Sequence, residues 1–66
     1  MQPGDKYVNG VGAVIVITDP TNDGRPQYNI AQSQEDYDAG KFVCMGTDSY
    51  ESLDKILKDN SYVKVN

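Results

Sequence analysis

One uninterrupted apolar run, residues 12–18, constrains the fold of this chain more than any other stretch. It reads Gly-Ala-Val-Ile-Val-Ile-Thr, and its β-branched residues favour a strand. Side chains alternate between the two faces of a strand, so Val14 and Val16 share one face while Ile15 and Ile17 share the other. Both faces are apolar and need cover. A helix near the C-terminus can cover one of them, whereas the other needs a loop, a second copy of the chain or a partner.

The chain length and the cysteine content bound what can stabilise the fold. We expect residues 1–66 to form one small domain, with a disordered lead over residues 1–6, where a Pro-Gly pair breaks regular structure. A domain of this size buries only about 60% of the surface of its unfolded chain. Its single cysteine, Cys44, cannot form an internal disulfide, and the chain has no histidine to complete a zinc site. We expect no cofactor or metal, and interpret Cys44 as a small core residue in a reducing cytoplasm.

The charge balance argues against binding to nucleic acid. Six basic and ten acidic side chains give a net charge of −4 at pH 7, and the basic residues are scattered along the chain. A phosphate backbone is bound by clustered lysine and arginine. No stretch resembles a signal peptide, and the longest apolar run is far shorter than the roughly 20 residues that span a bilayer. We therefore expect a cytoplasmic protein that binds neither nucleic acid nor membrane.

The segment before the apolar run has two interpretations. Residues 9–12, Asn-Gly-Val-Gly, form either a tight turn or a bulge, because Asn-Gly favours hairpins and glycine tolerates positive φ. We favour the bulge, since the arm before Asn9 is too short to be a hairpin partner. The first strand would then run from Tyr7 to Thr18.

Residues 19–24 end that strand, because almost every residue there favours a turn. Asp19, Thr21 and Asp23 also alternate as in the first half of a calcium-binding loop. The similarity ends at Ile30, which stands where such a loop needs a bidentate glutamate. We interpret residues 19–24 as a hairpin loop.

Two further strands and an acidic segment follow. Residues 27–33 alternate between apolar and polar side chains, which predicts a half-buried strand paired with the first. Residues 34–40 place three carboxylates around one tyrosine, and we expect a loop there. Residues 41–47 are apolar on both faces, which predicts a strand inside the sheet or covered twice.

The period then changes to that of a helix. Apolar residues at helical spacing predict a helix over residues 49–59, with Asp48 and Glu51 as a capping box and Asn60 as a left-handed stop. Two acid-first pairs at i,i+4 spacing support it, Glu51 with Lys55 and Asp54 with Lys58. Residues 61–66 alternate again, as in a short last strand. The chain therefore has the pattern of an α+β fold, β-β-β-α-β, in which a small antiparallel sheet carries one helix on one face.

The residues available for catalysis do not favour an enzyme. Without histidine, neither a Ser-His nor a Cys-His pair can form, and Lys41 lies on the opposite strand face from Cys44. The carboxylates of residues 35–38 lie in a segment that we expect to be exposed, where nothing would separate their pKa values for acid–base chemistry. We predict a protein without catalytic activity.

Recognition of another protein is the remaining class of function. A tyrosine beside carboxylates is typical of an interface with a basic partner, because the ring supplies contact area and the acids supply charge complementarity. The alternative is that a charged loop is simply solvated. The candidate partner-binding residues are the acidic and aromatic side chains of the two loops: Glu35, Asp36, Tyr37, Asp38, Asp19 and Asp23.

The arrangement of the third strand and the helix resembles the partial RNase H-like domain of HicB antitoxins. The resemblance lies in residues 44–48, Cys-Met-Gly-Thr-Asp, followed by residues 49–53, Ser-Tyr-Glu-Ser-Leu. In that family a cysteine-containing strand likewise precedes an acidic cap and a Tyr-Glu-Glu-Ala-like helix start. The family's proline-rich second strand is absent here. The resemblance implies neutralisation of a toxin by direct binding.

A second resemblance is one of kind. Small, acidic, histidine-free proteins include the inhibitors that phages encode against host or defence enzymes, several of which present carboxylates where the target expects phosphates. Our first hypothesis is therefore a non-catalytic inhibitor- or antitoxin-type protein that binds a basic surface on a partner protein. The alternative is a structural or assembly subunit that self-associates, for example as a homodimer, through the second apolar face or an edge strand.

Overall fold

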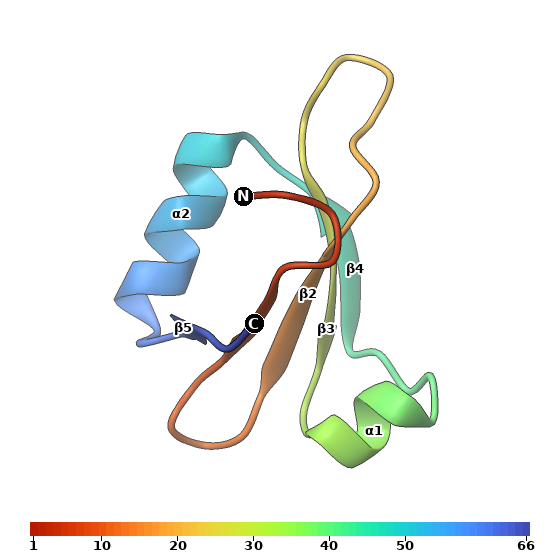
Figure 1. The fold of residues 1–66 in the computed structure, drawn as a ribbon, viewed down its shortest axis with the longest axis vertical. Helices are drawn as coiled ribbons and strands as arrows, with labels where there is room; N and C mark the ends of the chain where they lie inside the picture. The colour runs from red at the N-terminus through yellow and green to blue at the C-terminus, as the bar shows by residue number, and fades with distance from the viewer.

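The computed structural model describes residues 1–66 as a five-stranded antiparallel sheet with one long helix on one face (Figure 1). The strand order in the sheet is β4-β3-β2-β1-β5. The predicted α+β class is confirmed, with one strand and one short helix more than the predicted order. Neither helix is long and apolar enough to cross a membrane. The elements in chain order are β1 (Lys6–Val8), β2 (Val14–Thr18), β3 (Gln27–Ala31), α1 (Gln34–Asp38), β4 (Cys44–Thr47), α2 (Tyr50–Asp59) and β5 (Val63–Lys64).

The apolar run forms β2, the central strand of the sheet. Ile15 lies opposite Tyr7 of β1 and Ile30 of β3, and directly opposed residues share a face. Ile15 has no exposed surface, and Ile17 on the same face is also buried. The burial of β2 follows from its having a strand on each side and α2 above it.

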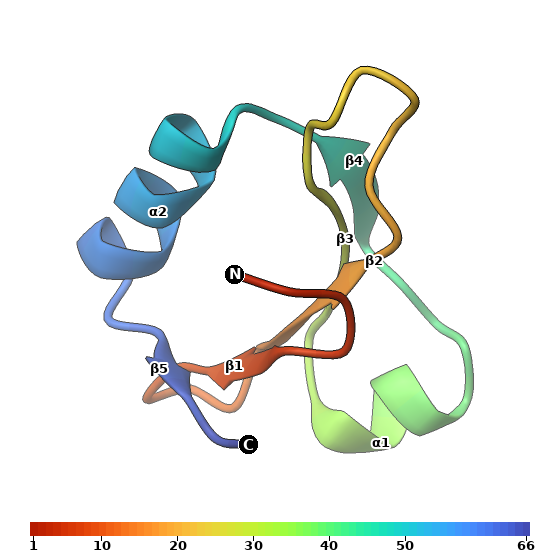
Figure 2. The same cartoon turned by 45° about the horizontal axis from the view of Figure 1, so that its top comes forward.

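Helix α2 covers this first face of the sheet (Figure 2). Leu53 and Leu57 pack against Ile15 and Ile17 to form the core, as the helical spacing predicts. Four partly buried side chains pack around that core: Tyr7, Tyr28, Ile30 and Tyr62. Partial burial raises the pKa of all three tyrosines, with nearby acidic groups adding to the effect at Tyr7 and Tyr28.

The second face of the sheet is covered at one end only. Val14 and Ala31, which lie opposite one another, are 1% and 0% exposed. They lie at the end of the sheet next to α1, which contacts β3 (Figure 1). Farther along this face Val16 is half-buried and Met45 is 70% exposed. The sequence predicted that a loop, a second copy of the chain or a partner covers this face. Part of that cover comes from α1.

The bulge predicted at residues 9–12 is wrong, because this segment is the turn of a hairpin between β1 and β2. The side-chain oxygen of Asn9 accepts hydrogen bonds from the backbone N–H groups of Val11 and Ala13, at 3.1 and 2.9 Å. Gly12 adopts a φ of 88°, which other residues rarely adopt. The Asn9 side chain closes the turn, so a three-residue β1 suffices as a partner.

The interior position predicted for residues 41–47 is also wrong. Only Cys44–Thr47 form a strand, and β4 is an edge strand with β3 as its sole neighbour. Cys44 is consequently exposed rather than part of the core. A strand that is apolar on both faces can be central or at an edge. Which of the two it is depends on the order in which the strands pair.

The predicted helix over residues 49–59 is confirmed, but its caps differ. The N-cap is Ser49, whose hydroxyl accepts the N–H of Ser52 at 3.1 Å, while Asp48 accepts the N–H of Ser49 at 2.9 Å. The left-handed residue after the helix is Ser61, with a φ of 58°, and not Asn60. The serine hydroxyl reaches the first-turn amide directly, which leaves Glu51 outside the cap.

Both termini are tied to the sheet at its β5 edge. The Asn66 side chain accepts the N–H of Lys6 and donates to the carbonyl of Gly4, each at 2.9 Å. Lys64 pairs with Asp5 at 3.7 Å. The N–H of Gly4 donates to the carbonyl of Ile17 at 2.8 Å, so sheet contacts begin within the segment that we expected to be disordered.

Candidate functional site

The acidic segment is a short helix, α1, where the sequence predicted a loop. Ser33 is its N-cap, and its hydroxyl accepts the N–H of Asp36 at 3.1 Å. The Gln34 side chain donates to Asp38 at 2.9 Å, and the carbonyl of Asp36 accepts the N–H of Lys41 at 2.8 Å. The capping serine, three residues before Asp36, is the signal in the sequence that could have identified this helix.

The carboxylates of α1 are not paired with any cation. Glu35 and Asp38 are exposed and Asp36 is half-buried, and none of the three forms an ion pair. The ring of Tyr37 packs on Phe42 with centroids 5.5 Å apart and an angle of 57° between the planes. This contact holds α1 against the segment that leads into β4, so the acids are presented by an anchored element.

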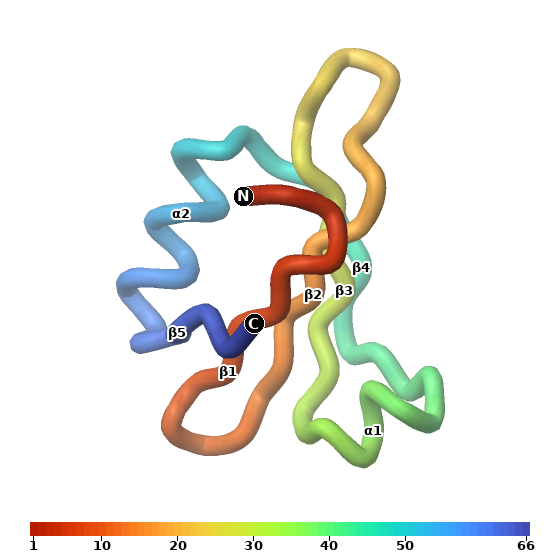
Figure 3. Tube along the Cα trace, viewed as in Figure 1, coloured from red at the N-terminus to blue at the C-terminus, as the bar shows by residue number.

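Asp19 and Asp23 lie elsewhere, in the loop that joins β2 to β3. Their loop and α1 flank opposite ends of the β2–β3 hairpin, whose five-residue strands are roughly 13 Å long (Figure 3). Asp23 pairs with Arg25 at 3.1 Å. A hydrogen bond from Thr21, together with the charge of Arg25, lowers the pKa of Asp23. The six predicted residues therefore form two separate groups, and the unpaired charge is concentrated at α1.

A second surface, which the sequence analysis did not identify, is the exposed β4 edge. Met45 is 70% exposed and Val43, just before the strand, is 59% exposed. The strand itself carries no charged residue. Beside it, on the face away from α2, lies a shallow depression lined by residues of three strands: Thr18, Gln27, Tyr28, Asn29, Met45, Gly46 and Thr47.

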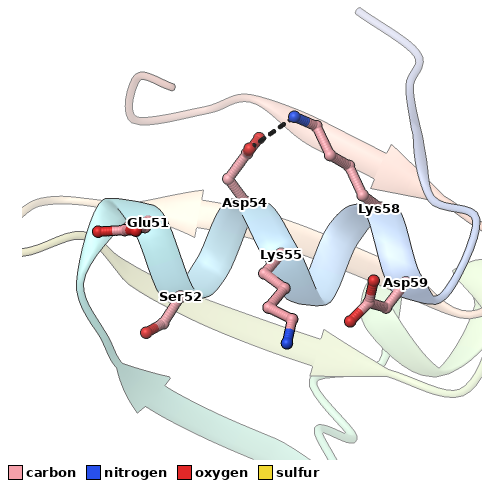
Figure 4. A pocket seen from close by; sticks show the side chains of 6 residues that line it. All are labelled: Glu51, Ser52, Asp54, Lys55, Lys58 and Asp59. Carbon is pink, nitrogen blue, oxygen red and sulfur yellow. Dashed lines mark ion pairs between the residues drawn. The ribbon is translucent and has the colours of Figure 1, made fainter.

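The outer face of α2 carries a second depression, lined only by polar side chains (Figure 4). Asp54 and Lys58 form the predicted ion pair at 2.9 Å, which raises the pKa of Lys58, whereas Glu51 and Lys55 form none. Acidic and basic groups are mixed along this helix, in contrast to α1. The structure brings together no group of three side chains able to hold a metal ion.

No protein-family model, curated protein or solved structure matches this chain.

Proposed function

We propose that this chain is a non-catalytic protein-binding module that binds a basic surface on a partner protein through α1. The observation that carries the proposal is the set of three α1 carboxylates, Glu35, Asp36 and Asp38, which no lysine or arginine of the chain neutralises. Carboxylates left unpaired by their own chain are available to a cationic surface, and they favour fast, charge-steered association.

The environment of α1 supports a role as a preformed contact. The Tyr37–Phe42 contact fixes the helix to the segment that leads into β4, and the hydrogen bond from the Lys41 N–H to the Asp36 carbonyl closes its C-terminal end. Less entropy is then lost when the carboxylates meet a partner. An inhibitor or antitoxin that imitates phosphate would use such a display, with the acids taking the place of a nucleic acid backbone on its target.

The direct test is partner capture at low and high salt, followed by a charge variant. We expect one basic protein to be retained at low salt and released at high salt, since exposed charges are screened by salt. Replacing Glu35→Gln, Asp36→Asn and Asp38→Asn together should abolish binding and leave the fold intact. These amides retain the size of the side chains, and the amide oxygen that replaces the carboxylate of Asp38 can still accept from Gln34.

A matched control variant shows whether binding depends on where the acidic charges lie or only on the net charge of the chain. Glu51→Gln, Asp54→Asn and Asp59→Asn remove the same number of charges from the outer face of α2, at the cost of one exposed ion pair, and leave α1 unchanged. Binding that survives in this control but not in the α1 variant supports the proposal. Equal loss in both would assign the effect to net charge, and full binding by the α1 variant would refute the role of α1.

The second candidate function is self-association as a structural or assembly subunit. The exposed, uncharged β4 edge favours it, because an open strand edge can pair with the same edge of another copy. Sedimentation velocity over a range of protein concentrations tests this candidate. A dimer that persists at high salt would support it, whereas a monomer at every concentration would exclude it.

A further inference from the structure

The two edges of the sheet differ in how far they are open to another strand. The β5 edge has only two residues. It ends beside the Lys64–Asp5 ion pair and the Asn66 side chain, which is hydrogen-bonded to the backbone of Lys6 and Gly4. The β4 edge has four residues and no charge, and β3 is its only neighbouring strand. The Thr47 hydroxyl also donates to the carbonyl of Pro26, just before β3, at 2.9 Å. Short, charged edges resist the addition of a strand, whereas long, uncharged edges invite it. Only β4 is therefore suited to strand addition.

The register identifies the free backbone groups of β4. The N–H of Asp48 donates to the carbonyl of Pro26, and Gly46 lies opposite Tyr28. Because hydrogen-bonded and non-hydrogen-bonded pairs alternate in an antiparallel ladder, Gly46 and Cys44 bond to β3. The N–H and C=O groups of Met45 and Thr47 then point to the open edge. A partner strand would pair with these two residues.

The side chains along this edge indicate which residues such a strand would carry. Met45 lies opposite Asn29 and Thr47 opposite Gln27, on the face that α2 does not cover. The exposed Met45 side chain can contact apolar side chains at alternate positions of an added strand. An extended segment with apolar residues at every second position fits this surface.

The position of α1 indicates what should flank that segment. Helix α1 precedes β4 in the chain and lies beyond its Cys44 end, so a strand added antiparallel to β4 would run toward α1 (Figure 1). Antiparallel pairing is the more stable arrangement per residue, and it is the arrangement of every pair in this sheet. Basic residues that follow the apolar segment would then reach Glu35, Asp36 and Asp38.

A second copy of the chain is a poorer occupant by the same criterion. An antiparallel β4–β4 pair would bring the Asp48 end of one copy toward α1 of the other, so that acids would meet acids. Charge complementarity therefore favours a basic partner.

We propose that β4 binds an extended segment of the partner by antiparallel strand addition, with lysine or arginine residues after that segment meeting α1. This inference rests on the proposed function and adds the form of the partner. The backbone of Met45 and Thr47 supplies the hydrogen bonds, and the α1 carboxylates supply the charge that fixes the direction of the strand.

The test uses a synthetic peptide that alternates threonine with valine and ends in lysines, added to the full chain. We expect the amide protons of Met45 and Thr47 to become protected from hydrogen exchange, while those of Cys44 and Gly46, already bonded to β3, change little. A peptide of the same composition with its lysines at the start should bind more weakly, since its charges would lie away from α1.

Two changes isolate the backbone contribution. Met45→Pro removes an N–H that faces solvent, which an edge strand tolerates, and should weaken binding about tenfold, whereas Met45→Val retains the donor and should bind like the parent. Methylating the backbone of the peptide at the positions that face Met45 and Thr47 should weaken binding similarly without altering the protein. This second change keeps the test decisive if Met45→Pro impairs folding.

The outcomes separate the two proposals. Loss of binding both with the backbone changes and with the α1 charge variant supports strand addition at β4. Binding that needs the α1 acids but is unaffected by methylation would overturn strand addition and leave the charge-based function standing. Absence of any protection by the peptide would overturn the inference. Protection of Met45 and Thr47 that rises with protein concentration alone would assign the edge to a second copy.

Discussion

Strands β2 and β4 are both apolar in sequence and both end in a threonine, yet their surroundings differ completely. Strand β2 pairs on both sides and lies under α2, and its Ile15 has no exposed surface. Strand β4 pairs with β3 alone, and its Met45 is 70% exposed. The same kind of side chain therefore stabilises the fold in one strand and is free for contacts in the other.

The difference arises from the number of neighbours rather than from hydrophobicity. A central strand is enclosed by its neighbours and, here, by Leu53 and Leu57 of the covering helix. An edge strand keeps one row of backbone groups and part of both faces in water. Stability should consequently be concentrated at β2 and α2, and binding at β4 and α1.

The largest expected effect is that of a charge placed in the central strand. Ile15→Asp should unfold the protein, because a carboxylate with no partner would occupy a site without solvent access. Met45→Asp should leave the protein folded, since that side chain is in water. Circular dichroism and urea titration of both variants test the contrast. A folded Ile15→Asp variant would show that β2 is not the core strand.

Removal of apolar volume should give a smaller contrast in the same direction. Leu53→Ala should lower the free energy of unfolding by about 2–5 kcal/mol, because Leu53 is fully buried under α2. Met45→Ala should change it by at most about 0.5 kcal/mol, as is usual for surface substitutions. Chemical denaturation provides both values, and similar losses in the two variants would contradict an open β4 edge.

Removing the two helix caps should have effects of intermediate size. Ser49→Ala removes the N-cap of α2 and should cost about 1 kcal/mol of global stability, because α2 covers the core. Ser33→Ala removes the cap of α1 and should increase amide exchange in α1 with little global loss, since α1 has no buried residue. A larger global loss for Ser33→Ala would make α1 part of the stabilising region.

The smallest expected effect is a loss of stability at alkaline pH, which arises from the tyrosines that pack around the core under α2. The pKa values of Tyr7, Tyr28 and Tyr62 are raised above 10.0 by partial burial. Above that pH the unfolded state loses protons before the folded state does, so the free energy of unfolding should fall as pH rises. Below pH 10.0 the contribution is fully present. Tyr62→Phe should reduce the slope, and an unchanged slope in that variant would remove Tyr62 from the explanation.

The main elements could be predicted from the sequence because their periodicities are strong. The apolar run of β2 and the helical spacing of Leu53 and Leu57 indicate a strand and an amphipathic helix without reference to the rest of the chain. The edge position of β4 could not be predicted, since pairing order depends on contacts between distant segments. The hairpin at Asn9 was missed because one side chain closes a turn with a very short partner strand.

The candidate site was predictable only in part. The α1 acids are neighbours in sequence and remain together in the structure, whereas Asp19 and Asp23 lie beyond the other end of a hairpin. The β4 surface has no local signal, because Val43 and Met45 in the sequence resemble core residues. Solvent exposure of an apolar strand is a property of the assembled sheet.

Amide hydrogen exchange of the free protein, followed residue by residue at several protein concentrations, tests most directly whether β4 is an open edge. We expect Met45 and Thr47 to exchange rapidly at every concentration. The amide of Ile15, paired with Tyr7 of β1, and that of Ile17, which donates to the carbonyl of Asp5 just before β1, should exchange slowly. Slow exchange at Met45 and Thr47 in dilute protein would mean that the edge is already occupied, and would contradict the division between a stabilising core and a free binding edge.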